Sequence, residues 1–134
     1  MKGKSFFRPV ILFVFVSLAL ASSHADTARE IIADSGIKGG LIVHVGCGDG
    51  RLTIALHAGE SYIVHGLDTD VQGIERARRY IRSLGLYGKV SVDTFDGANL
   101  PYTDNLVNLL VVSKAYRISK REMLRAVSYT HLTL

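Results

Sequence analysis

Residues 41–50 read LIVHVGCGDG, a largely apolar run that ends in three glycines at alternate positions, Gly46, Gly48 and Gly50. An apolar run of this kind predicts a strand buried on both faces, as in a parallel sheet that helices cover on each side. A glycine turn directly after the strand allows the backbone to approach a ligand closely, and it directs the start of the next helix toward that ligand. The stretch therefore predicts a strand, a ligand-binding turn and a helix, in that order.

Strand-like and helix-like segments alternate over most of the chain. Apolar segments predict strands at residues 40–45, 61–68, 89–95 and 106–113. Helical spacing and stop signals predict helices at residues 26–36, 49–59, 70–85 and 114–126. Asp26 or Thr27 is expected to cap the first helix, and Asp70 the third. This alternation predicts an α/β fold built on a doubly wound parallel sheet.

Acidic residues follow the second and third predicted strands. Asp68 ends the second strand, at about the distance from Gly46 at which nucleotide-binding sheets carry a ribose-binding acid. An ionised carboxylate there can accept two hydrogen bonds from a ribose diol. Asp96 follows the third strand, and the carboxyl ends of parallel strands meet at one edge of the sheet. Each acid alone is also typical of a turn, but three ordered elements on neighbouring strands favour a nucleoside-binding site.

The spacing of the glycines limits the kind of ligand. Dinucleotide-binding turns have the pattern GxGxxG, and its third glycine would fall at Arg51. The pattern here is GxGxG instead, which favours a ligand without a pyrophosphate at the turn. An NAD-dependent oxidoreductase is therefore the weaker alternative.

The ordered motifs resemble those of the class I S-adenosylmethionine-dependent methyltransferases. LIVHVGCGDG is similar to the first motif of that family, HGLDTD to the second, and FDGANLPYTDNLVNLLVV to the third and fourth. The resemblance implies a Rossmann-like fold and S-adenosylmethionine as cofactor, with an acid at Asp68 holding the ribose and an acid at Asp96 facing the adenine amino group. It implies no metal ion, and it names neither the methyl acceptor nor a catalytic residue. The cofactor-binding residues that it implies are Gly46, Cys47, Gly48, Gly50, Asp68, Thr69, Asp96 and Gly97.

Two positions depart from the pattern of the family. His44 stands where an acid usually helps to hold the methionine end of the cofactor, and Asn108 stands where an acid is common in the fourth strand. A neutral imidazole at His44 could form one hydrogen bond to the cofactor, or it could be packed and satisfied within its strand. Cys47 is the only cysteine, which excludes an intramolecular disulfide, and its side chain is interpreted as a small group packed in the turn.

The first 25 residues have the pattern of a secretory signal peptide. Basic residues precede a short apolar core, and small residues at Ser23 and Ala25 mark a cleavage site. The apolar core is too short to cross a bilayer comfortably, and an uncleaved membrane anchor is the alternative. Without residues 1–25 the chain is nearly neutral, which gives no reason to expect a nucleic-acid partner. We therefore expect an exported protein, periplasmic or extracellular, that meets the membrane only through an N-terminal signal helix.

The end of the chain fits no pattern of regular structure. Residues 127–134 lack helical spacing and strand alternation, and we expect them to be a non-native tail. The methyltransferase-like part then spans residues 26–126 and supplies strands one to four of a seven-stranded family sheet. We therefore expect an incomplete sheet, a missing C-terminal portion, and an open apolar edge beside the fourth strand.

Several phrases of the sequence also resemble exported bacterial proteins in which such a domain precedes a quinoprotein-like β-propeller. The leading function is an S-adenosylmethionine-binding, methyltransferase-type domain that acts on an unknown acceptor. The alternative is a non-catalytic or repurposed domain of the same fold within an exported multidomain protein.

Overall fold

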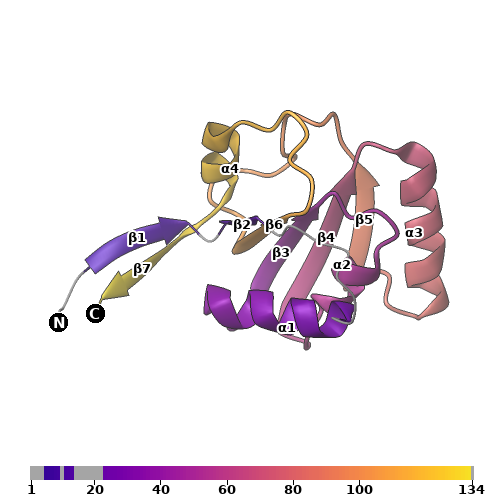
Figure 1. Ribbon diagram of the computed structural model, residues 1–134, viewed down its shortest axis with the longest axis horizontal. Coiled ribbons are helices and arrows are strands. Elements are labelled where there is room, and N and C mark those ends of the chain that lie inside the picture. The colour runs from indigo at the N-terminus through magenta and orange to yellow at the C-terminus, as the bar shows by residue number, and fades with distance from the viewer. Residues whose placement is uncertain (1–4, 10, 14–22, 134) are drawn as a thin grey trace.

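A parallel sheet forms the centre of the computed structural model, which describes residues 5–9, 11–13 and 23–133 (Figure 1). Its strand order is β2-β6-β3-β4-β5, and every neighbouring pair is parallel. The predicted α/β fold with a doubly wound parallel sheet is therefore confirmed. The strands are β2 (Ile11–Phe13), β3 (Gly40–Val45), β4 (Tyr62–Asp68), β5 (Val90–Thr94) and β6 (Leu109–Val112).

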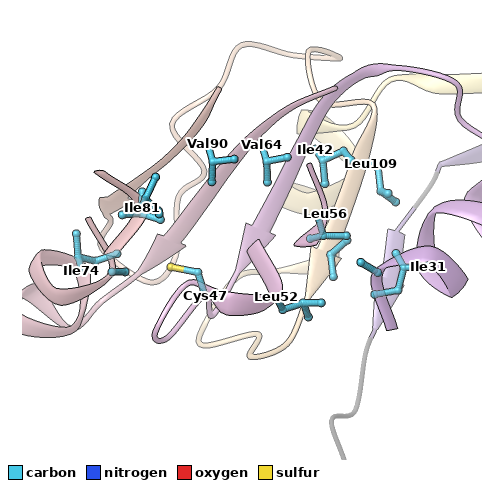
Figure 2. Close-up of a cluster of buried hydrophobic side chains, with 14 residues drawn as sticks. Ile31, Ile42, Cys47, Leu52, Leu56, Val64, Ile74, Ile81, Val90 and Leu109 are labelled. Atoms are coloured by element: carbon cyan, nitrogen blue, oxygen red, sulfur yellow. The ribbon is translucent and has the colours of Figure 1, made fainter. Parts of the chain in front are cut away.

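Helices cover both faces of this sheet. The helices are α1 (His24–Ser35), α2 (Arg51–Ala55), α3 (Val71–Ser83) and α4 (Lys120–Ala126). Buried residues of α1, α2 and α3 pack against one face, where Figure 2 shows Ile31, Leu52 and Ile74 directed toward the strands. Helix α4 and the loops around it cover the opposite face, and Met123 of α4 is buried in that second core.

Successive residues of the central strands alternate between the two cores. In β3, Ile42 packs with α1–α3, whereas Val43 packs on the side of α4, and both side chains are fully buried. In β6, Leu109 and Leu110 divide in the same way. Burial on both faces explains why these strands are continuous apolar runs, as the sequence indicated.

The helix ends agree with the predicted caps in part. Asp70 caps α3, because its carboxylate accepts a hydrogen bond from the Gln72 N–H. The predicted cap of α1 at Asp26 or Thr27 was wrong, since the Ser23 hydroxyl accepts from the Asp26 N–H and the helix begins at His24.

Two helices are shorter than the sequence predicted. Helix α2 has five residues and ends before Leu56, whose side chain is nevertheless buried in the core. Helix α4 begins at Lys120 and not at residue 114, because the Ser119 hydroxyl caps it by accepting from the Glu122 N–H. Residues 114–118 are therefore a loop that follows β6 at the sheet edge.

The segment expected to be a signal helix forms strands where the structure describes it. Residues Ser5–Pro9 form β1, which pairs antiparallel with β7 (Tyr129–Thr133) as a ribbon beside the main body (Figure 1). Strand β2 pairs with β6, so the edge predicted to be open is occupied by Ile11–Phe13. The rest of the signal-peptide prediction lies outside the described residues. In the part of the chain that the structure describes, no helix has the length and apolar character to cross a membrane.

The last residues take a more regular structure than the sequence indicated. Val127 is fully buried and forms a bridge with Val107, and the Ser128 N–H donates to the Val107 carbonyl at 2.7 Å. Residues 129–133 form β7. Residues 127–133 therefore have regular contacts that the sequence did not indicate, and the non-native origin of this tail stays a prediction.

Gly66 allows the glycine turn after β3 to pack against β4. A Cβ atom at Gly66 would lie 2.9 Å from the Cβ of Cys47 and 3.0 Å from a Val92 methyl group. We expect Gly66→Ala to lower the free energy of unfolding by about 1–3 kcal/mol, because the buried neighbours would have to move. Urea denaturation measures this change. Gly59→Ala is the matched control, since a Cβ there meets nothing within 4 Å, and equal losses in both variants would contradict the prediction.

Candidate functional site

The candidate site lies where the parallel strands end. Because β3, β4, β5 and β6 run in the same direction, the segments that follow them lie along one edge of the sheet (Figure 1). Those segments contain Gly46–Gly50, Asp68 and Thr69, Asp96 and Gly97, and the loop at residues 113–118. All the residues implied as cofactor-binding by the sequence are therefore on the edge where doubly wound sheets bind ligands.

The glycine turn after β3 is held in left-handed conformations. Gly46, Gly48 and Gly50 have φ values of 84°, 55° and 84°, which residues with a side chain rarely adopt. A Cβ at Gly46 would lie 2.8 Å from the Lys114 backbone nitrogen, so this glycine lets the loop after β6 approach. At Gly48 a Cβ would meet nothing within 4 Å. Gly48 is thus the position at which backbone faces open space, as close approach of a ligand requires.

The Asp68 carboxylate joins the glycine turn to the end of β4. One of its oxygens accepts from the Gly48 N–H at 3.0 Å, and the other accepts from the Thr69 N–H at 2.7 Å. Burial alone would raise the pKa of Asp68, but hydrogen bonds from the Tyr116 hydroxyl and from backbone N–H groups outweigh burial and lower the pKa below its ordinary value. Asp68 is therefore an ionised, fixed acceptor at the sheet edge.

Tyr116 lies in the candidate site, although the cofactor-binding residues predicted from the sequence do not include it. Its hydroxyl donates to Asp68 at 2.5 Å. Its ring contacts Phe95 edge-to-face at 5.8 Å between centroids, and the Lys114 ammonium lies 5.0 Å from the centre of the ring. The sequence placed Tyr116 in a helix, and only the late start of α4 brings it over Asp68. The position of Tyr116 shortly after β6 indicates that it lies near the carboxyl ends of the strands. The spacing of residues does not, however, predict the left-handed backbone that directs its side chain to Asp68.

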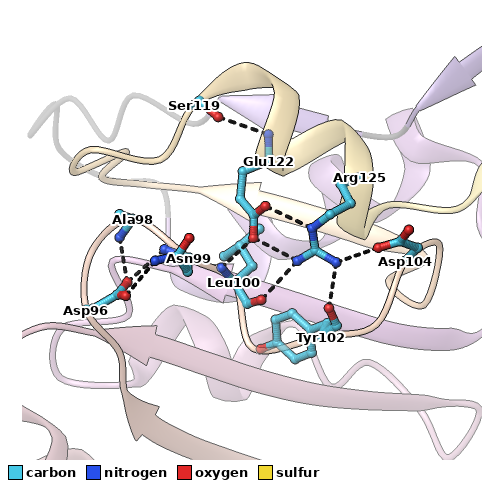
Figure 3. Close-up of polar contacts among 9 residues, drawn as sticks. All are labelled: Asp96, Ala98, Asn99, Leu100, Tyr102, Asp104, Ser119, Glu122 and Arg125. Carbon is cyan, nitrogen blue, oxygen red and sulfur yellow. Dashed lines mark hydrogen bonds and ion pairs between the residues drawn. The ribbon is translucent and has the colours of Figure 1, made fainter.

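Gly97 and Asp96 form the part of the site that follows β5. A Cβ at Gly97 would lie 3.4 Å from Thr69 and 3.7 Å from the Tyr116 Cβ, so these residues are brought together. Asp96 accepts hydrogen bonds from the Ala98 and Asn99 N–H groups and from the Asn99 side chain (Figure 3). These bonds from Asn99 and Ala98 lower the pKa of Asp96 to about 2. The carboxylate is exposed and ionised, and one lone pair of its second oxygen is available to a donor such as an amino group.

Cys47 contributes its backbone to the turn and its side chain to the core. The thiol side chain is buried, and Figure 2 shows it among the apolar residues between the sheet and α3. Burial, with the nearby charge of Asp68, raises the pKa of Cys47 to about 12. The thiol is therefore a packed, unreactive group, as the sequence analysis interpreted it, and its role as a cofactor contact is limited to the backbone.

His44 is a satisfied residue of the core. Its Nδ1 lies 2.8 Å from the Thr53 hydroxyl and its Nε2 lies 2.8 Å from the Ser113 hydroxyl. Burial lowers the pKa of His44 from 6.5 to about 4, against a smaller opposing effect of Asp68. Both ring nitrogens are thus used by the protein, and the neutral imidazole joins β3, α2 and the end of β6. Of the two readings left open by the sequence, the packed one is correct.

Asn108 belongs to the other end of the sheet. Its side-chain oxygen accepts from the Leu41 N–H at 2.9 Å, near the start of β3. This contact needs Gly40, where a Cβ would lie 2.2 Å from the same oxygen. The departure of Asn108 from the family pattern therefore concerns the alignment of β3 with β6 and leaves the candidate site unchanged.

Arg125 fastens the loop that follows Asp96 to helix α4. Its guanidinium binds the Glu122 carboxylate at 2.7 and 2.8 Å, the Leu100 and Tyr102 carbonyls, and the Asp104 carboxylate (Figure 3). All five donors of the guanidinium are used in this way. Glu122 also accepts from the Leu100 N–H at 2.8 Å. The network fixes the loop that carries Asp96 and Gly97.

The described residues contain no group of three or more histidine, cysteine, aspartate or glutamate side chains that could hold a metal ion. Across the same ranges, every buried side-chain nitrogen or oxygen has a hydrogen-bond partner. The polar groups that the site presents are the carboxylates of Asp68 and Asp96 and the backbone N–H groups bonded to them.

Comparisons with known proteins identify the family. Residues 42–132 match the family of methyltransferase domains, and the chain belongs to that family. No curated protein matches the chain in sequence. The predicted class I methyltransferase fold is thereby confirmed.

Solved structures of two methyltransferases and of a cyclase share this fold. A candidate S-adenosyl-L-methionine-dependent methyltransferase from Methanococcus maripaludis has a TM-score of 0.70 at 26% identity, over 78% of this chain and 51% of that one. A methyltransferase from Aquifex aeolicus that depends on the same cofactor has a TM-score of 0.64 at 22% identity, over 75% and 58%. The cyclase SpnF has a TM-score of 0.67 at 22% identity, over 78% and 41%. The chain therefore spans about half the length of these structures.

The residues present fit an S-adenosylmethionine cofactor. The open space at Gly48 admits a ligand against the backbone, and Asp68 and Asp96 are ionised acceptors for hydroxyl and amino donors. The family and the methyltransferase structures likewise support S-adenosylmethionine as the cofactor. His44 does not take part in this fit, because both of its nitrogens are engaged.

The buried imidazole of His44 predicts a stability loss in mild acid. The folded state disfavours the protonated ring, so unfolding takes up a proton between the unfolded pKa of 6.5 and the folded pKa of about 4. We expect the free energy of unfolding to be fully retained above pH 6.5 and to fall by about 3 kcal/mol toward pH 4. Urea denaturation at a series of pH values measures this slope.

Two variants test whether His44 causes this pH dependence of the free energy of unfolding. His44→Asn should flatten it, since no buried ring is left to protonate, while the carboxylates that titrate at lower pH are common to both proteins. His24→Asn removes an exposed imidazole whose charge is a minor cause of the lowered pKa of His44, so this variant should keep most of the slope. An unchanged slope in the His44 variant would contradict the assignment.

The Arg125 network predicts that lysine cannot replace this arginine. A lysine ammonium has three donors and no planar fork, so at least two of the five acceptors would lose their partner. We expect Arg125→Lys to lower the free energy of unfolding clearly, measured by urea denaturation, because acceptors in the loop lose their donors. Arg121→Lys on the exposed side of α4 is the control and should change the free energy by less than about 0.5 kcal/mol.

Proposed function

We propose that this chain binds S-adenosylmethionine between the glycine turn and Asp68, and that the bound cofactor serves methyl transfer to an acceptor. The observation that carries the proposal is the hydrogen bond from Gly48 N–H to Asp68, beside the open space over Gly48. It places a rigid backbone surface and an ionised carboxylate next to each other. A nucleoside needs both, because its ribose donates to a carboxylate while its remaining atoms lie against backbone.

Different residues bind different parts of the cofactor. In this proposal Asp68 accepts from the ribose diol, Asp96 accepts from the adenine amino group, and Gly97 leaves room beside the ring. The backbone of Gly46–Gly50 lies along the part of the ligand that follows the ribose. His44 offers neither a charge nor a free nitrogen, so recognition of the methionine end falls to backbone groups of the turn.

The contribution of the chain to the reaction is positioning. When bound, S-adenosylmethionine supplies an electrophilic methyl group on a sulfonium sulfur. Transfer of such a group needs an in-line approach of the acceptor, and a base only when the acceptor carries a proton. The rigid turn, fixed by hydrogen bonds of the Gly46 and Gly50 N–H groups to Leu67 and Cys47 carbonyls, holds the ligand in a defined orientation.

A pair of glycine variants tests the binding site. Gly48→Ala and Gly36→Ala both place a methyl group in a left-handed conformation with no atom within 4 Å, but Gly36 ends α1 outside the proposed site. We expect similar losses in the free energy of unfolding, about 1–2 kcal/mol in each. Only Gly48→Ala should weaken binding of S-adenosylhomocysteine, roughly tenfold or more, because its methyl group occupies the ligand's space.

Isothermal titration calorimetry with S-adenosylmethionine and S-adenosylhomocysteine provides the measurement. Absence of binding to the unmodified chain would refute the proposed function. Equal weakening by both alanine substitutions would show instead that general destabilisation, and not the ligand site, controls affinity.

A repurposed domain of an exported protein is the second candidate. Its support is the basic and apolar start of the sequence, together with the neutral, fully engaged His44. The fold itself also serves a protein named as a cyclase, SpnF. Fusing residues 1–25 to a reporter and fractionating the cells tests the export, and methyl transfer by the exported fraction would count against a non-catalytic role.

A further inference from the structure

The hydrogen-bonding capacity of Asp68 is nearly filled by the protein itself. A carboxylate offers about four lone pairs to donors. In Asp68, Oδ2 accepts from the Gly48 N–H alone and keeps one lone pair, whereas Oδ1 accepts from the Thr69 N–H and the Tyr116 hydroxyl, with a longer contact of 3.4 Å from the Asp70 N–H. The second hydroxyl of a diol therefore needs an oxygen whose lone pairs are already taken. A ribose diol donates two hydrogen bonds, so at least one present donor has to leave when the diol binds.

Only one of these donors can leave without altering the fold. The N–H groups of Gly48 and Thr69 belong to the turn after β3 and to the end of β4, and their positions follow from the sheet. Tyr116 reaches Asp68 with a side chain, from a loop that follows β6. Its hydroxyl can therefore turn away while the backbone donors keep their places.

The backbone conformation of Tyr116 supports a departure of its hydroxyl from Asp68. Its φ of 52° is left-handed, which is uncommon for a residue with a large side chain and costs about 1–2 kcal/mol. The contact with Asp68, the edge-to-face packing on Phe95 and the Lys114 ammonium near the ring offset that cost. Burial and the hydrogen bond to Asp68 raise the pKa of Tyr116 to about 12, so the hydroxyl is protonated and acts as a donor.

We infer that the Tyr116 hydroxyl occupies the place of a ribose hydroxyl on Asp68 and competes with the nucleoside for that carboxylate. This inference rests on the proposed function. Tyr116 is thus a specificity-determining residue: a ligand enters only if it offers Asp68 hydrogen bonds at least as good as the one that it displaces. A ligand without the diol leaves the contact between Tyr116 and Asp68 intact.

Competition of this kind lowers the apparent affinity. The observed dissociation constant equals the intrinsic one divided by the fraction of molecules in which Asp68 is accessible. Removing the hydroxyl while keeping the ring should make that fraction close to one. A hydrogen bond to a charged group is strong enough to keep the Tyr116 hydroxyl on Asp68 in most molecules. We therefore expect Tyr116→Phe to tighten S-adenosylhomocysteine binding roughly tenfold.

Isothermal titration calorimetry of the 134-residue chain and of Tyr116→Phe with S-adenosylhomocysteine tests this expectation. Tyr87→Phe is the matched control, since it removes a hydroxyl that accepts from Arg78 beside β5, away from Asp68, and should leave the affinity unchanged. Unchanged or weaker binding in Tyr116→Phe, with binding intact in the unmodified chain, overturns the inference and leaves the proposed function standing. Failure of both proteins to bind overturns the proposed function and the inference with it.

Carbon NMR of ring-labelled tyrosine gives a second readout that does not depend on affinity. The resonance that disappears in Tyr116→Phe belongs to Tyr116. Adding S-adenosylhomocysteine to the unmodified chain should shift this resonance, because its hydroxyl loses a carboxylate acceptor. Addition of adenine, which has no ribose, should not shift it. A Tyr116 resonance that stays in place when S-adenosylhomocysteine binds would refute the displacement.

Discussion

The hydrogen bonds to the Asp68 carboxylate hold together the segments that follow the carboxyl ends of the strands. The carboxylate accepts from the turn after β3, from the residue that follows its own strand, and from the loop after β6. Three segments that are distant in sequence are thereby fixed around one charge. The same hydrogen bonds keep that charge ionised despite its burial, because each of them favours the carboxylate over the neutral acid. Under the proposed function, the atoms that hold these segments together are also the atoms that recognise the ribose.

The parts of the fold that follow from local sequence patterns could be predicted. The glycine turn and Asp68 have characteristic positions directly after apolar strands, and the structure places both at the expected edge. The cap at Asp70 was likewise readable from its side chain and position. These features need only the order of residues along the chain and the geometry of a parallel sheet.

The parts that depend on distant contacts could not be predicted. The partners of His44 are nine and 69 residues away, so its satisfied state was one of two open readings. The sequence placed Tyr116 near the expected site but interpreted it as part of the loop and helix start, because no pattern indicates its left-handed backbone or its contact with Asp68. The pairing of β2 with β6 was missed because an apolar, basic-flanked start has the composition of a targeting segment whether or not it pairs.

Arg125 has a consequence for how the site can move. Its five hydrogen bonds and the contact of Glu122 with the Leu100 N–H connect α4 to the loop beyond Asp96 (Figure 3). Helix α4 also begins two residues after the loop that carries Tyr116. A displacement of α4 would therefore move both the loop that follows Asp96 and the loop that carries Tyr116.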